Sequence, residues 1–234
     1  MIGHPRAQFR RILEASIRPL RRRYYMSGSG RLMVRMLPPS AREILGFDDD
    51  AAVGSRRIEV GGGGSPLPGY LHVEIDVVAR HVEVIAPAWQ LPFPDQWARE
   101  LMAIHVLEHL PPPLLSATLG EWHRILQPGG MLEVHVPNGP ELMKAYLGGD
   151  GVAKWRAGAA LLGMGASPNT AGPRDLTGRS DHQSIFDGSL IESLLMDAGF
   201  VDVTDLTDEV IDIHTAAWRS LVPHCSIVYR AARS

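Results

Sequence analysis

Apolar and polar positions follow two alternating periods along this chain from residue 56 onward. Short runs rich in Val, Ile and Leu, typical of buried strands, alternate with longer segments whose apolar residues recur every three or four positions, as in helices that bury one face. This alternation predicts an α/β fold, a Rossmann-like, seven-stranded, mostly parallel sheet with helices on both faces. Strands are predicted at residues 57–61, 70–75, 82–86, 101–105, 131–136, 201–206 and 225–230. Helices are predicted at residues 112–126, 140–147, 151–164, 188–198 and 215–221.

The segment before residue 51 has a different pattern. Apolar residues between Phe9 and Tyr24 recur at helical spacing, and arginines fill the other faces. We predict a basic amphipathic helix that ends at the Ser-Gly-Ser-Gly sequence of residues 27–30, and a second helical piece at 31–45. The basic helix could pack on the core or on a second subunit, dock on anionic lipid, or bind a phosphorylated substrate; packing, including a homodimer contact, is the favoured hypothesis. Residues 1–50 are thus expected to be an N-terminal helical extension of a domain that covers 51–234.

The end of the first predicted strand carries the most distinctive local sequence. Val60 is followed by four glycines, which let a ligand approach the backbone closely, and the second strand ends in acidic residues that can hold ribose hydroxyls. In a dinucleotide site, a helix separates these two features and faces a pyrophosphate. Only residues 65–69, with two prolines, intervene here, so a crossover helix cannot form. The pattern predicts a nucleotide-type cofactor without a pyrophosphate.

Further motifs follow in order: Leu-Pro-Phe-Pro-Asp at 91–95, His-Val-Leu-Glu-His at 105–109, and Gln-Pro-Gly-Gly at 127–130. Together with the glycine-rich strand end, they resemble the class I S-adenosylmethionine-dependent methyltransferases, specifically the type 11 branch with a short first crossover. The resemblance covers about residues 56–137 and continues from Asp181 to Phe200. It implies S-adenosylmethionine as the cofactor. It also implies that an insertion at about residues 140–182 caps the substrate pocket.

The resemblance assigns the cofactor contacts to individual residues. The loop contacts fall on Gly61, Gly62 and Gly63. Glu74 is the ribose-binding acid, with Asp76 as the alternative on the same face of the strand, and His105 lies near the methionine end. Many relatives carry an acid after the third strand that accepts a hydrogen bond from adenine, and this chain has none there. Adenine is therefore expected to be held by backbone groups and apolar contact from Ala88, Trp89 and Leu91.

His105 and His109 also frame the His-x-x-Glu-His pattern of certain zinc proteases. That chemistry needs both histidines one turn apart on a helix, with a further ligand downstream. Here the pattern directly follows a strand, and three prolines begin at residue 111, so a long helix cannot hold it. No metal ion is expected.

Two histidines are candidates for the catalytic base. A hydroxyl acceptor loses its proton during methyl transfer, and an imidazole has a suitable intrinsic pKa to receive it. His109 is the first candidate, and His182 is the second. A structural explanation competes for the region around His182, because Asp187 has the position of an N-cap for the helix at 188–198.

The expected acceptor is a small molecule, and O-methylation of a sugar or natural-product hydroxyl is the favoured reaction. The chain lacks the (Asp/Asn)-Pro-Pro-aromatic and Pro-Cys elements of nucleic-acid methyltransferases, and its net charge of −3 gives no basic footprint for nucleic acid. The alternative is a degenerate cofactor-binding module that interacts with partners through its basic N-terminal helices. A single cysteine, Cys225, excludes a disulfide framework, and no apolar run is long enough to span a membrane; a cytoplasmic protein is expected, with peripheral membrane contact left open.

Overall fold

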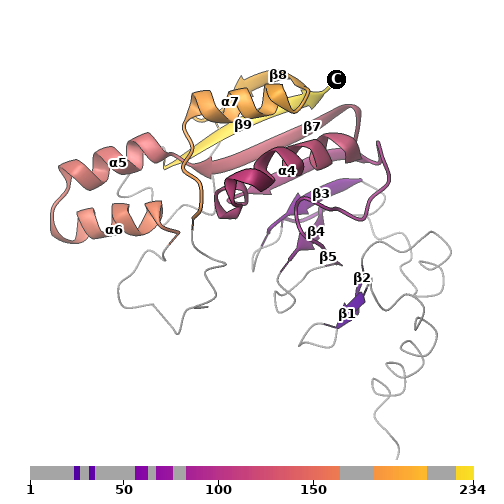
Figure 1. Ribbon diagram of the computed structural model, residues 1–234, viewed down its shortest axis with the longest axis horizontal. Coiled ribbons are helices and arrows are strands. Elements are labelled where there is room, and N and C mark those ends of the chain that lie inside the picture. The colour runs from indigo at the N-terminus through magenta and orange to yellow at the C-terminus, as the bar shows by residue number, and fades with distance from the viewer. Residues whose placement is uncertain are drawn as a thin grey trace, which may run out of the picture.

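The structure is a computed structural model of the 234-residue chain (Figure 1). It describes residues 24–26, 32–34, 56–62, 67–75, 83–163, 182–209 and 225–234. The helices predicted before residue 24 and at 215–221 lie outside this part. Among the residues described, no helix is both long and apolar enough to cross a membrane.

A seven-stranded sheet forms the centre of the described part, in the order β5-β4-β3-β6-β7-β9-β8. Its strands are β3 (Arg57–Val60), β4 (Leu71–Glu74), β5 (Val84–Ile85), β6 (Ala98–Ile104), β7 (Leu126–Pro137), β8 (Phe200–Asp205) and β9 (Ser226–Arg233). The strands from β5 to β7 in this order are parallel, whereas β9 is antiparallel to both of its neighbours. The predicted α/β class with a mostly parallel sheet is confirmed.

The direction of strand addition reverses next to β3. The chain runs from β3 outward to β4 and β5, and then returns to place β6 on the other side of β3. In open α/β sheets, ligands bind beyond the carboxyl ends of the strands at such a switch point. The carboxyl ends of β3, β4 and β6 are therefore where this fold can hold a ligand.

Two helices cover one face of the sheet. They are α4 (Pro112–Ile125), which starts with prolines that suit a first helical turn, and α7 (Gly188–Asp197), and they lie side by side in Figure 1. Their apolar stripes are fully buried at Leu119, Trp122, Ile191 and Leu195. Helices on the other face stay a prediction, because these two described helices share one face.

The helices α5 (Gly139–Gly148) and α6 (Gly151–Leu161) pack against each other and project from the end of β7 (Figure 1). Asn138 begins the pair, because its side chain accepts a hydrogen bond from the N–H of Glu141. Both helices were predicted. They form the first part of the segment assigned to a cap, and its capping role stays a prediction.

Two sequence predictions are wrong in part. Leu32–Val34 forms a strand, β2, paired antiparallel with β1 (Tyr24–Met26), where helices were predicted on both sides of residue 30. Aromatic residues and Val34 lie on either side of the Ser-Gly-Ser-Gly sequence there, and such a pattern is a hairpin signal. In addition, β6 and β7 begin earlier than predicted, at Ala98 and Leu126, because these residues pair with each other ahead of a register irregularity.

Candidate functional site

The glycine loop after β3 lies against the end of β6. Gly61 has a φ of +74°, and a Cβ atom there would lie 2.5 Å from Cγ2 of Val106. A Cβ atom on Gly62 would lie 2.7 Å from the carboxylate of Glu59. Both positions therefore require glycine, and the backbone at this strand end can be approached closely. Gly63 lies outside the described residues.

Glu59 is a buried carboxylate behind this loop that sequence reasoning missed. Its exposed fraction is 0%. Its Oε2 accepts a hydrogen bond from the N–H of Leu67 at 2.8 Å and lies 2.6 Å from Nδ1 of His72. Glu59 thus connects the glycine loop to the returning arm of the crossover and to β4. The available signal was an acidic residue inside a buried strand, directly before the glycines.

Glu74 ends β4 at the same edge of the sheet and is half-buried. Its Oε1 accepts a hydrogen bond from the N–H of Ile75 at 2.7 Å, which holds the carboxylate at the strand end. The alternative ribose residue, Asp76, lies outside the described part of the chain.

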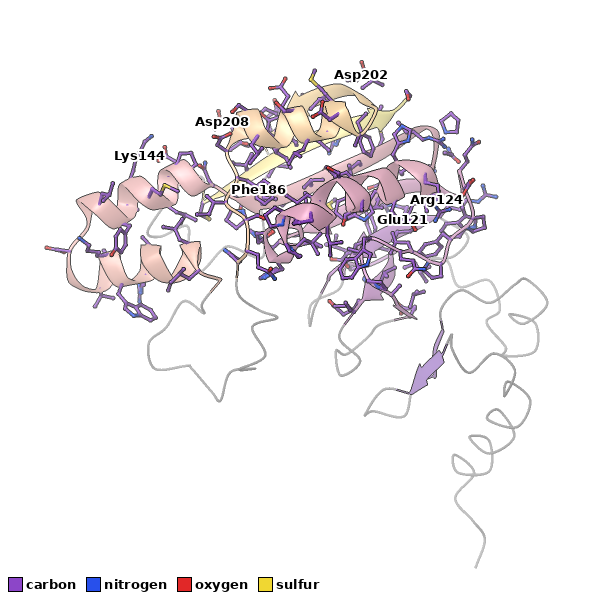
Figure 2. The ribbon with its side chains drawn as sticks, viewed as in Figure 1. Glu121, Arg124, Lys144, Phe186, Asp202 and Asp208 are labelled. Atoms are coloured by element: carbon purple, nitrogen blue, oxygen red, sulfur yellow. The ribbon has the colours of Figure 1, made fainter. Side chains whose placement is uncertain are left out.

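Side chains of α4 hold the loop that follows β5. Glu121 Oε1 accepts a hydrogen bond from the N–H of Leu91 at 2.6 Å, and Arg124 Nη2 donates to the carbonyl of Leu91 at 3.2 Å; Figure 2 labels both α4 residues. The hydrogen bond from Arg124 to Glu121, 2.8 Å from Nε to Oε2, raises the pKa of the guanidinium. This fixed ion pair sets the backbone conformation of the loop.

The three residues predicted to contact adenine differ in how far their side chains are exposed. The side chains of Ala88 and Leu91 belong to the buried core, whereas Trp89 is only partly buried against it. The carbonyl of Ala88 also accepts a hydrogen bond from the indole N–H of Trp122 at 3.0 Å. Of the three, Trp89 therefore offers the most side-chain surface.

His105 follows β6 in a left-handed backbone conformation, with a φ of +55°. Its N–H donates to the carbonyl of His135 at 2.9 Å. Its Nδ1 lies 2.8 Å from Oε1 of Glu108, and its Nε2 lies 3.3 Å from Oγ of Ser226. Backbone strain of this kind persists only where the surroundings fix the residue, and it concentrates at functional sites. The imidazole is thus held in one orientation at the switch point.

The two histidines predicted as catalytic, His109 and His182, are in contact. Their ring centroids lie 4.9 Å apart with an edge-on geometry. His109 ends a single-turn 3-10 helix, η2 (Leu107–His109), and His182 arrives from the segment that leads into α7. Nδ1 of His182 lies 3.2 Å from the carbonyl of Leu161. Burial lowers the pKa of His182, although the carboxylate of Glu108 opposes this effect. Burial therefore favours the neutral imidazole.

Four hydrogen bonds fix the segment after the second histidine on the turn that carries the first. The N–H groups of Gln183 and Ser184 donate to the carbonyl of Glu108 at 2.6 and 3.1 Å. The side chain of Gln183 donates to the carbonyl of His109 at 3.0 Å, and the hydroxyl of Ser184 donates to that of Leu110 at 3.1 Å. Two segments far apart in sequence thus form one site.

The helical His-x-x-Glu-His arrangement of zinc proteases is not formed. His105 follows a strand, and His109 lies in η2. Glu108 between them is fully buried and contacts His105. The sequence predicted that Glu108 could orient a nearby imidazole; the structure shows that His105 is an imidazole it contacts, and that its backbone carbonyl holds the segment that follows residue 181.

The chain matches no protein-family model and no curated protein sequence. Several solved structures are similar. One is the CurJ carbon methyltransferase, with 15% identity over 76% of this chain and 48% of the other and a TM-score of 0.46. Another is a SAM-dependent methyltransferase from Archaeoglobus fulgidus, with 15% identity over 82% and 93% and a TM-score of 0.47. A third, from Thermotoga maritima, is described as a possible histamine N-methyltransferase, with 16% identity over 79% and 88% and a TM-score of 0.46.

This chain spans about half the length of the CurJ enzyme. At these identities and TM-scores, any assignment of function to this chain depends on its own topology and site residues.

Proposed function

We propose that this protein is an S-adenosylmethionine-dependent methyltransferase that methylates a hydroxyl group of a small molecule, a sugar or a natural product. The observation that carries the proposal is the convergence of the glycine loop, Glu74 and His105 at the switch point of the sheet. The crossover at residues 61–70 is too short to form the helix that binds a pyrophosphate in dinucleotide sites. S-adenosylmethionine has no pyrophosphate, so it does not require that helix. The ordered sequence motifs, which resemble this enzyme family, support the same function.

The residues at this edge fit such a cofactor. A side chain at Gly61 would fill the space beside the strand end. The carboxylate of Glu74 can accept hydrogen bonds from both ribose hydroxyls, and Trp89 offers a flat apolar surface for adenine. Ala88 and Leu91 would contribute mainly through their backbones, since their side chains lie in the core. When bound, the cofactor supplies an electrophilic methyl group on a sulfonium.

The histidine pair suits a hydroxyl acceptor. The acceptor oxygen forms its bond to the methyl carbon as the carbon–sulfur electron pair passes to sulfur, and the hydroxyl proton must leave. His109 is the first candidate to receive that proton, and His182 is the second. His109 lies one short turn beyond His105, which is expected at the methionine end of the cofactor, and His182 contacts His109.

Calorimetry with S-adenosylhomocysteine tests the cofactor site. Because hydrogen bonds to a charged group contribute about 1.5–3 kcal/mol, Glu74→Ala should weaken binding by roughly tenfold or more. Asp76→Ala should have a smaller effect. His109→Ala is the matched control for the acceptor side: we expect it to bind S-adenosylhomocysteine as wild type does, while turnover of a hydroxyl acceptor falls by about 10²–10⁴-fold.

Three outcomes would count against these assignments. Equal affinity in wild type and Glu74→Ala would remove Glu74 from the ribose site. Absence of any binding by the wild-type chain would overturn the methyltransferase proposal. Near wild-type turnover of His109→Ala, with loss of turnover in His182→Ala, would exchange the roles of the two histidines.

A further inference from the structure

A buried carboxylate beside the histidine pair has an unsatisfied oxygen. Glu108 has an exposed fraction of 0%. Its Oε1 pairs with Nδ1 of His105 at 2.8 Å, whereas its Oε2 has no hydrogen-bond partner among the residues that the structure describes. Burying a carboxylate oxygen without a partner is unfavourable, and such a group commonly pairs with a cation or coordinates a metal.

Nitrogen donors surround this carboxylate. One ligand atom from each of Glu108, His109 and His182 can be chosen so that the three lie within 4.8 Å of one another. Nε2 of His182 lies 3.9 Å from Oε1 of Glu108. In a tetrahedral zinc site, bonds of about 2.0–2.2 Å place ligand atoms about 3.3 Å apart, so metal binding would require these ligand atoms to approach by at most about 1.5 Å.

Neighbouring groups hold Glu108 and His182 in place through hydrogen bonds, as the residues around a metal site commonly do for its ligands. Nδ1 of His182 faces the carbonyl of Leu161 at 3.2 Å, so the proton of a neutral ring is held there and Nε2, 3.9 Å from Oε1 of Glu108, keeps a lone pair that can bind a metal ion. Glu108 is itself held by His105. Histidine ligands that donate their second N–H to a carbonyl, and carboxylate ligands that are hydrogen-bonded, are usual around protein-bound metal ions.

We infer that Glu108, His109 and His182 bind one divalent transition-metal ion of the zinc type, with a fourth position open. Two imidazoles and one carboxylate are a donor set that suits zinc, and an open position is typical of catalytic rather than structural sites. This site differs from the zinc-protease hypothesis, because His105 supports a ligand instead of being one, and His182 is recruited from a distant segment. It replaces the sequence expectation that no metal is bound.

The ion would take part in the proposed methyl transfer. Its role in the reaction rests on the proposed function, whereas its binding does not. A hydroxyl acceptor at the open position would lose its proton to water more easily, because a bound cation stabilises the developing negative charge on oxygen. Its oxygen would then form the bond to the methyl carbon as the carbon–sulfur pair passes to sulfur. The two histidines would act through the ion instead of receiving the proton directly.

Metal titration of the full chain tests the inference. After treatment with a chelator, the wild-type chain is titrated with Zn²⁺ by calorimetry and with Co²⁺, whose visible absorption reports tetrahedral coordination. We expect one equivalent to bind. Glu108→Gln and His182→Ala should each weaken binding by more than about tenfold, since even loss of a supporting residue costs 10–100-fold. His123→Ala, which changes a histidine on α4, should bind as wild type does.

The outcomes separate this inference from the proposed function. Binding that is absent, or unchanged in both Glu108→Gln and His182→Ala, overturns the metal site. S-adenosylhomocysteine binding is measured on the same samples: metal binding without cofactor binding would overturn only the methyltransferase proposal, and the reverse result would overturn only the metal site. Thermal unfolding of each variant verifies that it is folded, and His182→Ala provides the decision if Glu108→Gln does not fold.

Discussion

At the scale of single residues, Gly62 lies between two features. One is the ligand edge, which we define as the carboxyl ends of β3, β4 and β6; the other is the buried carboxylate of Glu59 behind it. A methyl group at this position would meet the carboxylate of Glu59 at 2.7 Å. Glu59 cannot easily move, because it is fully buried and holds the N–H of Leu67. The absence of a side chain at Gly62 is therefore a packing requirement as well as an opening toward a ligand.

Gly62→Ala should therefore damage both stability and cofactor binding. Overpacking of this kind typically costs about 1–3 kcal/mol, and displacement of the loop should reduce S-adenosylhomocysteine affinity by more than about tenfold. Urea unfolding and calorimetry measure the two effects. Gly120→Ala is the matched control: it lies in α4, nothing lies within 4 Å of its added Cβ atom, and we expect stabilisation by about 0.5–1 kcal/mol with unchanged affinity. Unaltered stability in Gly62→Ala would contradict the role given to Glu59.

The residues of the candidate site fall into two groups: those that local sequence identifies, and those whose surroundings depend on segments distant in sequence. The glycine loop, Glu74 and the histidines could be named from the sequence, because local spacing and strand ends identify them. Glu59 could not, and Glu108 was predicted only to orient a nearby imidazole, because the full burial of both carboxylates depends on other strands and loops. Their chemistry only becomes visible when the sheet brings these segments together.

At the scale of elements, α7 begins where the sequence predicted. The side chain of Asp187 accepts a hydrogen bond from the N–H of Leu190 at 2.8 Å, which satisfies one free donor of the first turn. This bond is the main cause that lowers the pKa of Asp187, and a second comes from the hydroxyl of Ser189. The helix start matters for the site, because the preceding segment carries His182.

Asp187→Ala should lower the free energy of unfolding by about 1 kcal/mol, as expected for loss of an N-cap. Because the folded state lowers the pKa of this acid, its contribution is present above the ordinary carboxyl pKa and is lost as the pH falls through the lowered value. Urea unfolding at neutral and acidic pH measures both. Ser189→Ala, which retains the cap, should cost less, and an equal loss in the two variants would argue against capping.

Elements with a strong local signal were predictable, and those defined by pairing were less so. The helices α4 to α7 follow from apolar periodicity, prolines and caps. The hairpin of β1 and β2 was taken for helix because its apolar residues also fit a helical period. The early starts of β6 and β7 depend on the pairing of Ala98 with Leu126, which precedes a Pro-Gly-Gly sequence that resembles a turn.

At the scale of the whole molecule, the carboxyl ends of the parallel strands form the ligand edge, whereas a polar cluster joins strands at their amino ends. Three side chains near the amino ends of β3, β4 and β6 form a cluster there: Arg57, Tyr70 and Glu100. Arg57 Nε lies 2.9 Å from Glu100 Oε2, and its Nη2 donates to the hydroxyl of Tyr70 at 2.6 Å. The hydroxyl of Tyr70 in turn donates to Glu100. This cluster joins the three strands whose other ends form the candidate site.

Deprotonation of Tyr70 at alkaline pH should lower the free energy of unfolding, although Tyr70 lies at the end of the sheet opposite the ligand edge. Burial first, and then the hydrogen bond to Glu100, raise the pKa of Tyr70 from 10.0 to about 12. Because the folded state holds this proton more tightly than the unfolded chain, the contribution of Tyr70 is fully present below about pH 10 and is lost as the pH rises toward about 12. The stability difference between wild type and Tyr70→Phe, from urea unfolding, should therefore shrink over that interval. Tyr146→Phe, at an exposed position on α5, is the matched control for the loss of a tyrosine hydroxyl outside the cluster. A constant gap between wild type and Tyr70→Phe across this range would show that the proton on Tyr70 does not stabilise the fold.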